Sequence, residues 1–315
     1  MTFTAVEDGS VELKAIGSPN VSGLHYRLGT SGNWSLYLPG NVLPLQAGDK
    51  IQFWNFSDTL STGSSDYVQF DFTGQIKASG FVNSLLNMGD TVPHHSFFSL
   101  FSGCLKLIQA PQFTNASVGS YGYQAMFTGC GIKSSPLLPA SSTANMAYSN
   151  MFRNCTSITN ASPIYTKTCG EYTFVSMFRN CSSLIHPPKF HLNRLSVYCF
   201  NDTFRDCSAL QEIPDLPIMT LHSYCYYGMF RACTSITRAY LPANTLASNC
   251  YRSMFEGASS LSNVEVNFTD WNASGNSTAN WLTGTAANGT FTKPSALSEE
   301  TGDSGIPTNW TIINK

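Results

Sequence analysis

The residues most able to do chemistry in this chain are ten cysteines, six histidines and a set of regularly spaced arginines. Ten cysteines could form disulfides or bind zinc, but no paired C-x-x-C motifs occur at zinc-finger spacing. The histidines show no metal-binding spacing with a carboxylate. Nucleophile-elbow, phosphate-loop and dinucleotide motifs are also missing from the sequence. We therefore expect a protein that is not an enzyme, with no cofactor and no metal.

The cysteines follow an internal repeat. The tetrad Phe-x-x-Cys recurs at steps of 25 or 26 residues, and a last copy has Ala258 in the cysteine position. The phenylalanines that begin the copies are Phe101, Phe127, Phe152, Phe178, Phe204, Phe230 and Phe255. Such regular spacing indicates a stack of similar structural units.

Nine of the ten cysteines lie either three residues after the repeated Phe or five residues before it. At the position five residues before the Phe, other copies have Ser, Gly, Ala or Thr in place of cysteine. This exchange is typical of a small buried packing residue. Disulfides remain an alternative for Cys199 with Cys207 and for Cys225 with Cys233. Cys169 is out of phase, and nothing in the sequence orients it as a nucleophile.

Two other columns of the repeat are candidate binding surfaces. The arginine column directly follows the Phe and consists of Arg153, Arg179, Arg205 and Arg231. Stacking would align these side chains into a basic stripe suited to sulfated, phosphorylated or uronic glycans. The alternative is a solvated edge whose side-chain stems cover neighbouring turns.

The polar column lies eight residues after the Phe. Its members are Gln109, Asn160, His186, Glu212, Arg238 and Asn263. Chemically varied side chains on a repeated frame are typical of a recognition surface, because the frame is constant and the contacts differ. Ordinary exposed strand positions are the alternative interpretation.

Each copy is expected to form one coil of a solenoid. Cys225 and Met229 are four residues apart, which predicts a helical turn over 224–230. A tight polar turn would follow, with Asn154 and Asn180 as turn formers. An apolar run such as 236–241 then predicts a short strand. A single coil cannot bury its apolar face, so about seven stacked coils would make a continuous core.

The flanks differ from the repeat and divide the chain into three parts. Alternating apolar residues over 1–90 predict a small antiparallel β domain, followed by the solenoid over 91–265 and an irregular cap over 266–315. All five tryptophans lie in the flanks. We expect them to cover the open solenoid ends, and a tryptophan platform for glycans is the alternative.

Composition narrows the class of protein. The 315 residues include 17 basic and 19 acidic side chains, so no strong overall field favours nucleic acid or an anionic membrane. Only 11% of residues are charged, less than half of the roughly 25% of average domains, while 42% are hydrophobic. No apolar run is long enough for a membrane span. This composition suits an extracellular or virion protein. The first residues do not resemble a secretory signal, so we expect either a removed leader or a phage protein released by lysis.

The repeated motif also resembles a known family. Copies such as Met-Phe-Arg-Asn-Cys-Thr-Ser-Ile at 151–158 and Met-Phe-Arg-Ala-Cys-Thr-Ser-Ile at 229–236 are similar to the BspA-like leucine-rich repeats of gut Bacteroidetes surface proteins and their phages. The resemblance implies a mainly β, right-handed BspA-like leucine-rich-repeat solenoid with short helices, used in adhesion or recognition.

The leading hypothesis is a surface-exposed recognition protein that binds a host-surface glycan or protein through the solenoid face. The alternative is a bacteriophage virion component, such as a fibre or tail-associated protein, that docks to other virion subunits. The expected location is the bacterial cell surface or the phage virion. Any homo-oligomer would form through the flanking regions.

Overall fold

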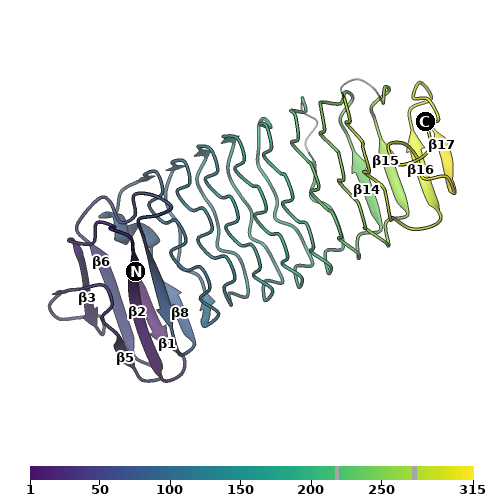
Figure 1. The fold of residues 1–315 in the computed structure, drawn as a ribbon. Coiled ribbons are helices and arrows are strands. Elements are labelled where there is room, and N and C mark those ends of the chain that lie inside the picture. The colour runs from purple at the N-terminus through teal and green to yellow at the C-terminus, as the bar shows by residue number, and fades with distance from the viewer. Residues whose placement is uncertain (217–219, 272–274) are drawn as a thin grey trace.

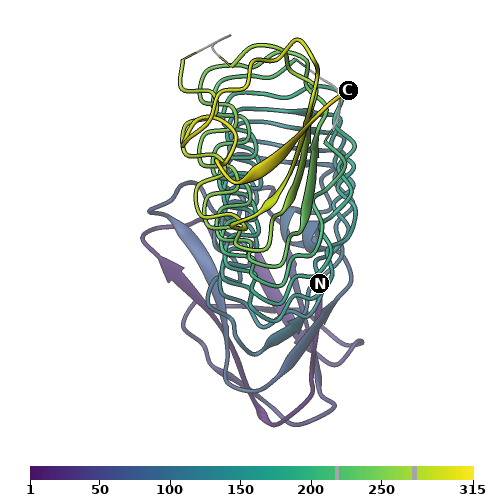
Figure 2. The ribbon, with the colours of Figure 1, turned by 90° about the vertical axis from the view of Figure 1, so that its right-hand side faces the viewer.

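The computed structural model describes residues 1–216, 220–271 and 275–315. These residues form an elongated, mainly β structure with N-terminal sheets at one end and a β-solenoid of about nine turns (Figure 1). A second view shows the turns stacked one behind another (Figure 2). No helix in the described ranges is long and apolar enough to cross a membrane.

The strands are short except near the two ends. The N-terminal elements are β1 (Thr2–Ala5), β2 (Gly9–Ile16), β3 (Leu24–Leu28), β4 (Ser35–Leu36), β5 (Leu43–Leu45), β6 (Lys50–Asn55), β7 (Tyr67–Phe72), β8 (Ile76–Ser79) and the 3₁₀ helix η1 (Val82–Leu86). Along the solenoid follow β9 (Thr91–Val92), β10 (Leu107–Gln109), β11 (Ser117–Val118), β12 (Ser142–Thr143), β13 (Thr168–Cys169), β14 (Arg238–Leu241), β15 (Asn263–Val266), β16 (Gly289–Lys293) and β17 (Trp310–Asn314).

The N-terminal strands form two sheets with an aromatic core between them. One sheet has the order β10-β8-β1-β6-β3-β4 and the other β5-β2-β7. Burial alternates along β1, β6 and β7, as expected for strands with one face in the core. Phe3 and Phe53 of the first sheet contact Phe70 of the second, with ring centroids 4.9 and 5.2 Å away.

In the solenoid the predicted helical turn over 224–230 is wrong. Every fourth residue of this segment, including Tyr224 and Gly228, has a positive φ, which an α-helix does not allow. The N–H of Met229 donates to the carbonyl of Tyr226, three residues back, whereas the N–H of Phe230 donates to Met254 in the next turn. The chain therefore alternates between tight turns and inter-turn bonds. The observed four-residue period also places Cys225 and Met229 on one side of the chain. Their spacing alone therefore could not distinguish a helical turn from this series of tight turns.

The same backbone pattern explains the recurrent asparagines. Two residues after the repeated Phe, Asn154 and Asn180 have φ values of 61° and 59°, and glycine takes this place in other turns. Asparagine and glycine are the residues that tolerate this left-handed conformation best. The prediction that Asn154 and Asn180 form turns is confirmed.

Two columns of stacked aromatic rings fill the solenoid core. Successive rings of the repeated Phe column lie 5.2–5.6 Å apart from Phe70 to Phe255. A second column, four residues before each repeated Phe, runs from Phe97 to Tyr251 with centroids 5.1–6.0 Å apart. Identical positions in successive turns therefore pack on one another, which makes the core continuous.

The solenoid extends beyond the expected seven coils at both ends. In the N-terminal region, Phe70 stacks on Phe101 at 5.4 Å, and β8 pairs in parallel with β10. Near the C-terminus, the N–H of Phe255 donates to the carbonyl of Trp281, which places Leu282 in the position of the repeated Phe. Both extra turns lack the Phe-x-x-Cys tetrad, so the motif did not reveal them.

The C-terminal region continues the parallel ladder and is not wholly irregular. Strands β14, β15, β16 and β17 form one sheet in sequence order. Trp271, Trp281 and Trp310 are buried at this end. Their indole N–H groups donate to main-chain carbonyls of Ser298, Gly305 and Ala286. The three tryptophans are therefore buried at the end that they were expected to cover, with Trp281 inside the added turn.

Candidate binding surfaces

The cysteines are structural packing residues. All ten are buried and free of disulfides, including the Cys199–Cys207 and Cys225–Cys233 pairs. Each cysteine that follows the repeated Phe donates its thiol to the carbonyl of the Phe one turn earlier, as in Cys155 to Phe127 at 2.8 Å and Cys207 to Phe178 at 3.0 Å. The packing interpretation of the sequence is confirmed, and the thiol also ties adjacent turns together.

Burial keeps these thiols protonated. It raises the pKa of Cys155 and Cys207 to about 12, because the thiolate would lose its hydration. Cys169, the one out of phase, is the exception among the shifted thiols. Hydrogen bonding to Cys199 lowers its pKa, and Ser196 acts in the same direction. Cys169 is itself buried, at the end of β13.

The one polar residue among the methionines before the repeated Phe also bonds between turns. Thr203 donates its hydroxyl to the carbonyl of Phe174 at 2.8 Å. A buried hydroxyl needs such a partner, because burial without one costs free energy. This hydrogen bond therefore compensates for burying a threonine at a position that is methionine in most other turns.

The arginine column is largely neutralised by carboxylates. Arg231 donates to Glu256 at 2.7 Å. Arg179 and Arg205 share Asp206, with Nε to Oδ2 distances of 3.6 and 3.5 Å. Arg153 has no ion pair among the described residues, and its covered Nε lacks a hydrogen-bond partner.

A third carboxylate, Asp202, lies beside the arginine column. Its nearest charge is Arg205, at 3.6 Å, and burial raises its pKa despite this neighbour. Gly228 in the next turn makes room for the Asp202 carboxylate, since a Cβ there would clash with Oδ1. Four arginines facing three carboxylates make the column nearly neutral. This arrangement favours the solvated-edge interpretation over a basic stripe.

The polar column is exposed throughout, as its position on the strand face requires. Its members Gln109, Asn160, His186, Glu212, Arg238 and Asn263 are all exposed. Asn160 and His186 form a parallel bridge, and Arg238 pairs with Asn263. Gln109 lies at the other end, where its amide donates to Ala78 of the N-terminal sheet at 3.1 Å. The column thus runs along the solenoid, but only part of it surrounds a cavity.

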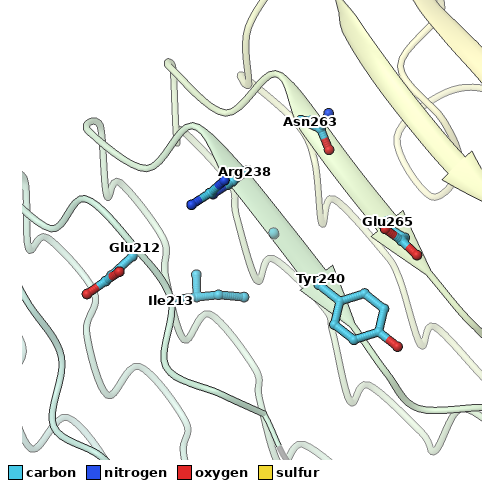
Figure 3. A pocket seen from close by; sticks show the side chains of 7 residues that line it. Glu212, Ile213, Arg238, Tyr240, Asn263 and Glu265 are labelled. Atoms are coloured by element: carbon cyan, nitrogen blue, oxygen red, sulfur yellow. The ribbon is translucent and has the colours of Figure 1, made fainter.

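That cavity lies on the strand face between neighbouring turns. It has a volume of about 260 Å³ and is lined by Glu212, Ile213, Arg238, Ala239, Tyr240, Asn263 and Glu265. Figure 3 shows Arg238 and Tyr240 on β14, Asn263 and Glu265 on β15, and Glu212 on the preceding turn. A shallower hollow of about 620 Å³ adjoins it and adds His186 and Ser235. We call the two together the strand-face site.

The strand-face site contains acidic and basic side chains together with an aromatic ring. Nδ1 of His186 lies 2.9 Å from Oε1 of Glu212, and both side chains are more than half exposed, at 57% and 56%. Arg238 has no ion pair among the described residues. Tyr240 is 47% exposed. An open cation beside a half-exposed ring can bind a polar ligand that also has an apolar face.

The side of the site nearest the C-terminus is held by Lys315. Its Nζ lies 2.6 Å from both the Glu265 carboxylate and the Asn267 amide oxygen. Asn267 in turn donates to the Tyr240 hydroxyl at 2.9 Å. These bonds fix the orientation of Tyr240 and Glu265.

The sequence identified four residues of the strand-face site and missed the others, among them Tyr240 and Glu265. His186, Glu212, Arg238 and Asn263 were in the polar column. Tyr240 and Glu265 lie ten residues after the repeated Phe, a position occupied by proline in several other turns. The change from proline to Tyr and Glu in adjacent copies was the available signal. In the described residues, no group of three or more His, Cys, Asp or Glu side chains is placed to hold a metal ion.

Comparisons with protein-family models, curated proteins and solved structures find no match to this chain.

Proposed function

We propose that this protein is a non-enzymatic recognition protein that binds a host-surface glycan through the strand-face site. The observation that carries the proposal is the cavity lined by Glu212, Arg238, Tyr240 and Asn263. These varied side chains project from a frame whose interior positions repeat from turn to turn. Recognition solenoids use such extended surfaces because each turn adds one set of contacts.

The chemistry of the strand-face site suits a sugar. Arg238 and Asn263 can donate hydrogen bonds, Glu212 can accept them, and the ring of Tyr240 offers an apolar surface. Sugars present hydroxyl groups around a ring with apolar C–H faces, so they need this combination. The openness of the hollow also fits a ligand attached to a larger surface.

Binding to a glycan array tests this proposal. We expect wild-type protein to bind a defined set of glycans, and Arg238→Ala and Tyr240→Ala each to weaken that binding about tenfold or more. Arg231→Ala is the matched control, because Arg231 belongs to the arginine column and is paired with Glu256. If binding survives Arg238→Ala but is lost when all four arginines of the arginine column are replaced by alanine, the binding site is the arginine column and not the strand-face site.

The type of repeat that forms the solenoid is a separate proposal. We propose that the repeats are of the BspA-like leucine-rich type, with a right-handed coil and an N-terminal β domain. The support is the Met-Phe-x-x-Cys-x-Ser-Leu/Ile motif, which occurs in full at 151–158, 177–184 and 229–236. Adhesion at a bacterial surface would follow from this identity.

The second candidate function is a virion structural component. It is favoured by exposed apolar side chains in the N-terminal region, where Leu28, Leu38 and Val42 are each more than half exposed. Exposed apolar side chains of this kind suit a contact with a neighbouring subunit. Absence of binding to glycans and to host cells, together with ordered incorporation into phage particles, would establish this alternative.

A further inference from the structure

The outward face of the six-stranded N-terminal sheet forms a third surface, remote in sequence from the strand-face site. Inward residues such as Ile51 and Phe53 are buried, so the alternate positions of β6 point away from the core. We call this surface the sheet face. It is defined by Thr2, Thr4, His25, Arg27, Trp34, Leu36, Lys50, Gln52, Trp54, Phe56, Lys77 and Ser79.

One end of the sheet face is aromatic. The ring of Trp54 lies 6.5 Å from Trp34 and 6.3 Å from Phe56, and Phe56 contacts His25 at 4.9 Å. Phe56 is 55% exposed, and Trp34 and Trp54 are half-buried. Burial in a core therefore does not explain this cluster of rings.

The tryptophans of this cluster differ from those at the C-terminal end. There each indole N–H donates to a carbonyl, as in Trp310 to Ala286 at 2.9 Å. Nε1 of Trp54 is covered and has no hydrogen-bond partner in the described structure. The guanidinium of Arg27 lies over the Trp34 ring, 4.6 Å from its centroid, which keeps a cation at the aromatic end.

The opposite end of the sheet face is cationic. Lys50 and Lys77 both pair with Thr4, one from each side, so their side chains flank this residue on one face. The six strands of this sheet contain three cations, Arg27, Lys50 and Lys77, and no Asp or Glu. These cations have no ion pair among the described residues.

The outward face of the neighbouring sheet is built differently. There Lys14 lies 2.5 Å from Asp71 and 3.8 Å from Glu12, so its charge is compensated. Of the two N-terminal sheets, whose strands all lie in the described ranges, only the six-stranded one therefore carries uncompensated cations. They attract an anionic group, and the aromatic rings beside them offer a platform for an apolar surface.

We propose that the sheet face is a second ligand site that binds a carboxylated oligosaccharide. One sugar ring packs on Trp54 and Phe56, while carboxylates of the chain reach Arg27 or the Lys50–Lys77 pair. Gln52 lies between the two ends, with its amide donating to Thr2 at 2.9 Å. Lys50 and Trp54 are about 14 Å apart along β6, at roughly 3.4 Å a residue, so the ligand spans more than one sugar.

Calorimetric titration of the full chain with trigalacturonic acid and with α2,3-sialyllactose tests this proposal. Neutral α1,4-galactotriose serves as the matched ligand, because it differs from trigalacturonic acid only at the carboxylates. We expect at least one of the acidic sugars to bind. Trp54→Ala should weaken binding about tenfold or more, and Phe56→Ala, which removes a mostly exposed ring, should act in the same direction.

Charge is tested separately from stacking. The Lys50→Gln/Lys77→Gln variant should lower affinity for the acidic sugar about tenfold and leave the weak binding of galactotriose unchanged. Lys14→Gln on the neighbouring sheet and Arg238→Ala in the strand-face site should have no effect. No measurable binding of either acidic sugar, or binding unaffected by both the lysine and the Phe56 variants, would overturn the proposal.

Discussion

The two ends of the solenoid use tryptophan in opposite ways. At the C-terminal end, Trp281 is fully buried and donates its N–H to Gly305, and Trp271 and Trp310 are bonded similarly. At the N-terminal end, Trp34 and Trp54 lie on the outward face of a sheet whose core is made of phenylalanines. A large ring therefore reveals its role only through its burial and through the partner of its N–H group. Burial at the C-terminal end accounts for three of the tryptophans, and the other two lie on the proposed ligand surface.

A large expected effect is a loss of stability at high pH, and it comes from the buried thiols of the coils and not from either end. Burial raises the pKa of Cys155, Cys207 and Cys250 from 9.0 to about 12. Between these pH values the unfolded chain has lost thiol protons that the folded chain keeps, so stability falls as pH rises through this window. At pH 10 each thiol should cost about 1.4 kcal/mol, and the three together about 4 kcal/mol.

Urea denaturation at pH 7 and pH 10 measures this loss. All five tryptophans lie outside the Phe-x-x-Cys coils, so their fluorescence follows the ends while far-ultraviolet circular dichroism follows the whole chain. The urea midpoint followed by dichroism should be lower at pH 10 than at pH 7, and it should fall more than the midpoint followed by tryptophan fluorescence. An unchanged midpoint would mean that the thiols ionise in the folded state.

A loss of stability of similar size is expected from a test of the two tryptophan roles. Trp281 is 0% exposed and packs on Tyr251 and Phe268. Trp281→Ala should lower the free energy of unfolding by about 3–5 kcal/mol, because it leaves a cavity and an unpaired carbonyl at Gly305. Trp34→Ala should cost less than about 1 kcal/mol. Equal losses in urea denaturation would contradict the contrast between the ends.

The smallest effect isolates the indole hydrogen bond. Trp310→Phe retains an aromatic ring but loses the bond to Ala286, and should destabilise the protein by about 1 kcal/mol. Trp54→Phe loses no hydrogen bond to the described residues, and should cost a few tenths of a kcal/mol at most. Thermal unfolding of the two variants measures these losses of stability. A larger loss for Trp54→Phe than for Trp310→Phe would show that Trp54 has a structural role.

Much of the solenoid could be predicted from the sequence, because a repeat imposes the same packing on every copy. The Phe-x-x-Cys spacing correctly indicated stacked turns and small buried cysteines. It did not indicate the extra turns at Phe70 and Leu282, because the N-terminal sheet and the C-terminal strands meet the ladder without the tetrad. The candidate site was foreseen in part. His186, Glu212 and Arg238 followed from their column, whereas Tyr240 and Glu265 did not, since their position is often proline.

The sequence by itself determined that the chain stacks similar turns around an aromatic and thiol core, because period and residue type are local properties. Only the tertiary structure decided which polar residues remain open to a ligand. The arginine column looked basic in sequence, yet Asp202, Asp206 and Glu256 lie beside it. Lys50 and Lys77 are 27 positions apart, yet they flank Thr4 on one unneutralised face. Charge balance depends on spatial neighbours, and several of these come from other turns, such as Asp206 beside Arg179 and Glu256 beside Arg231.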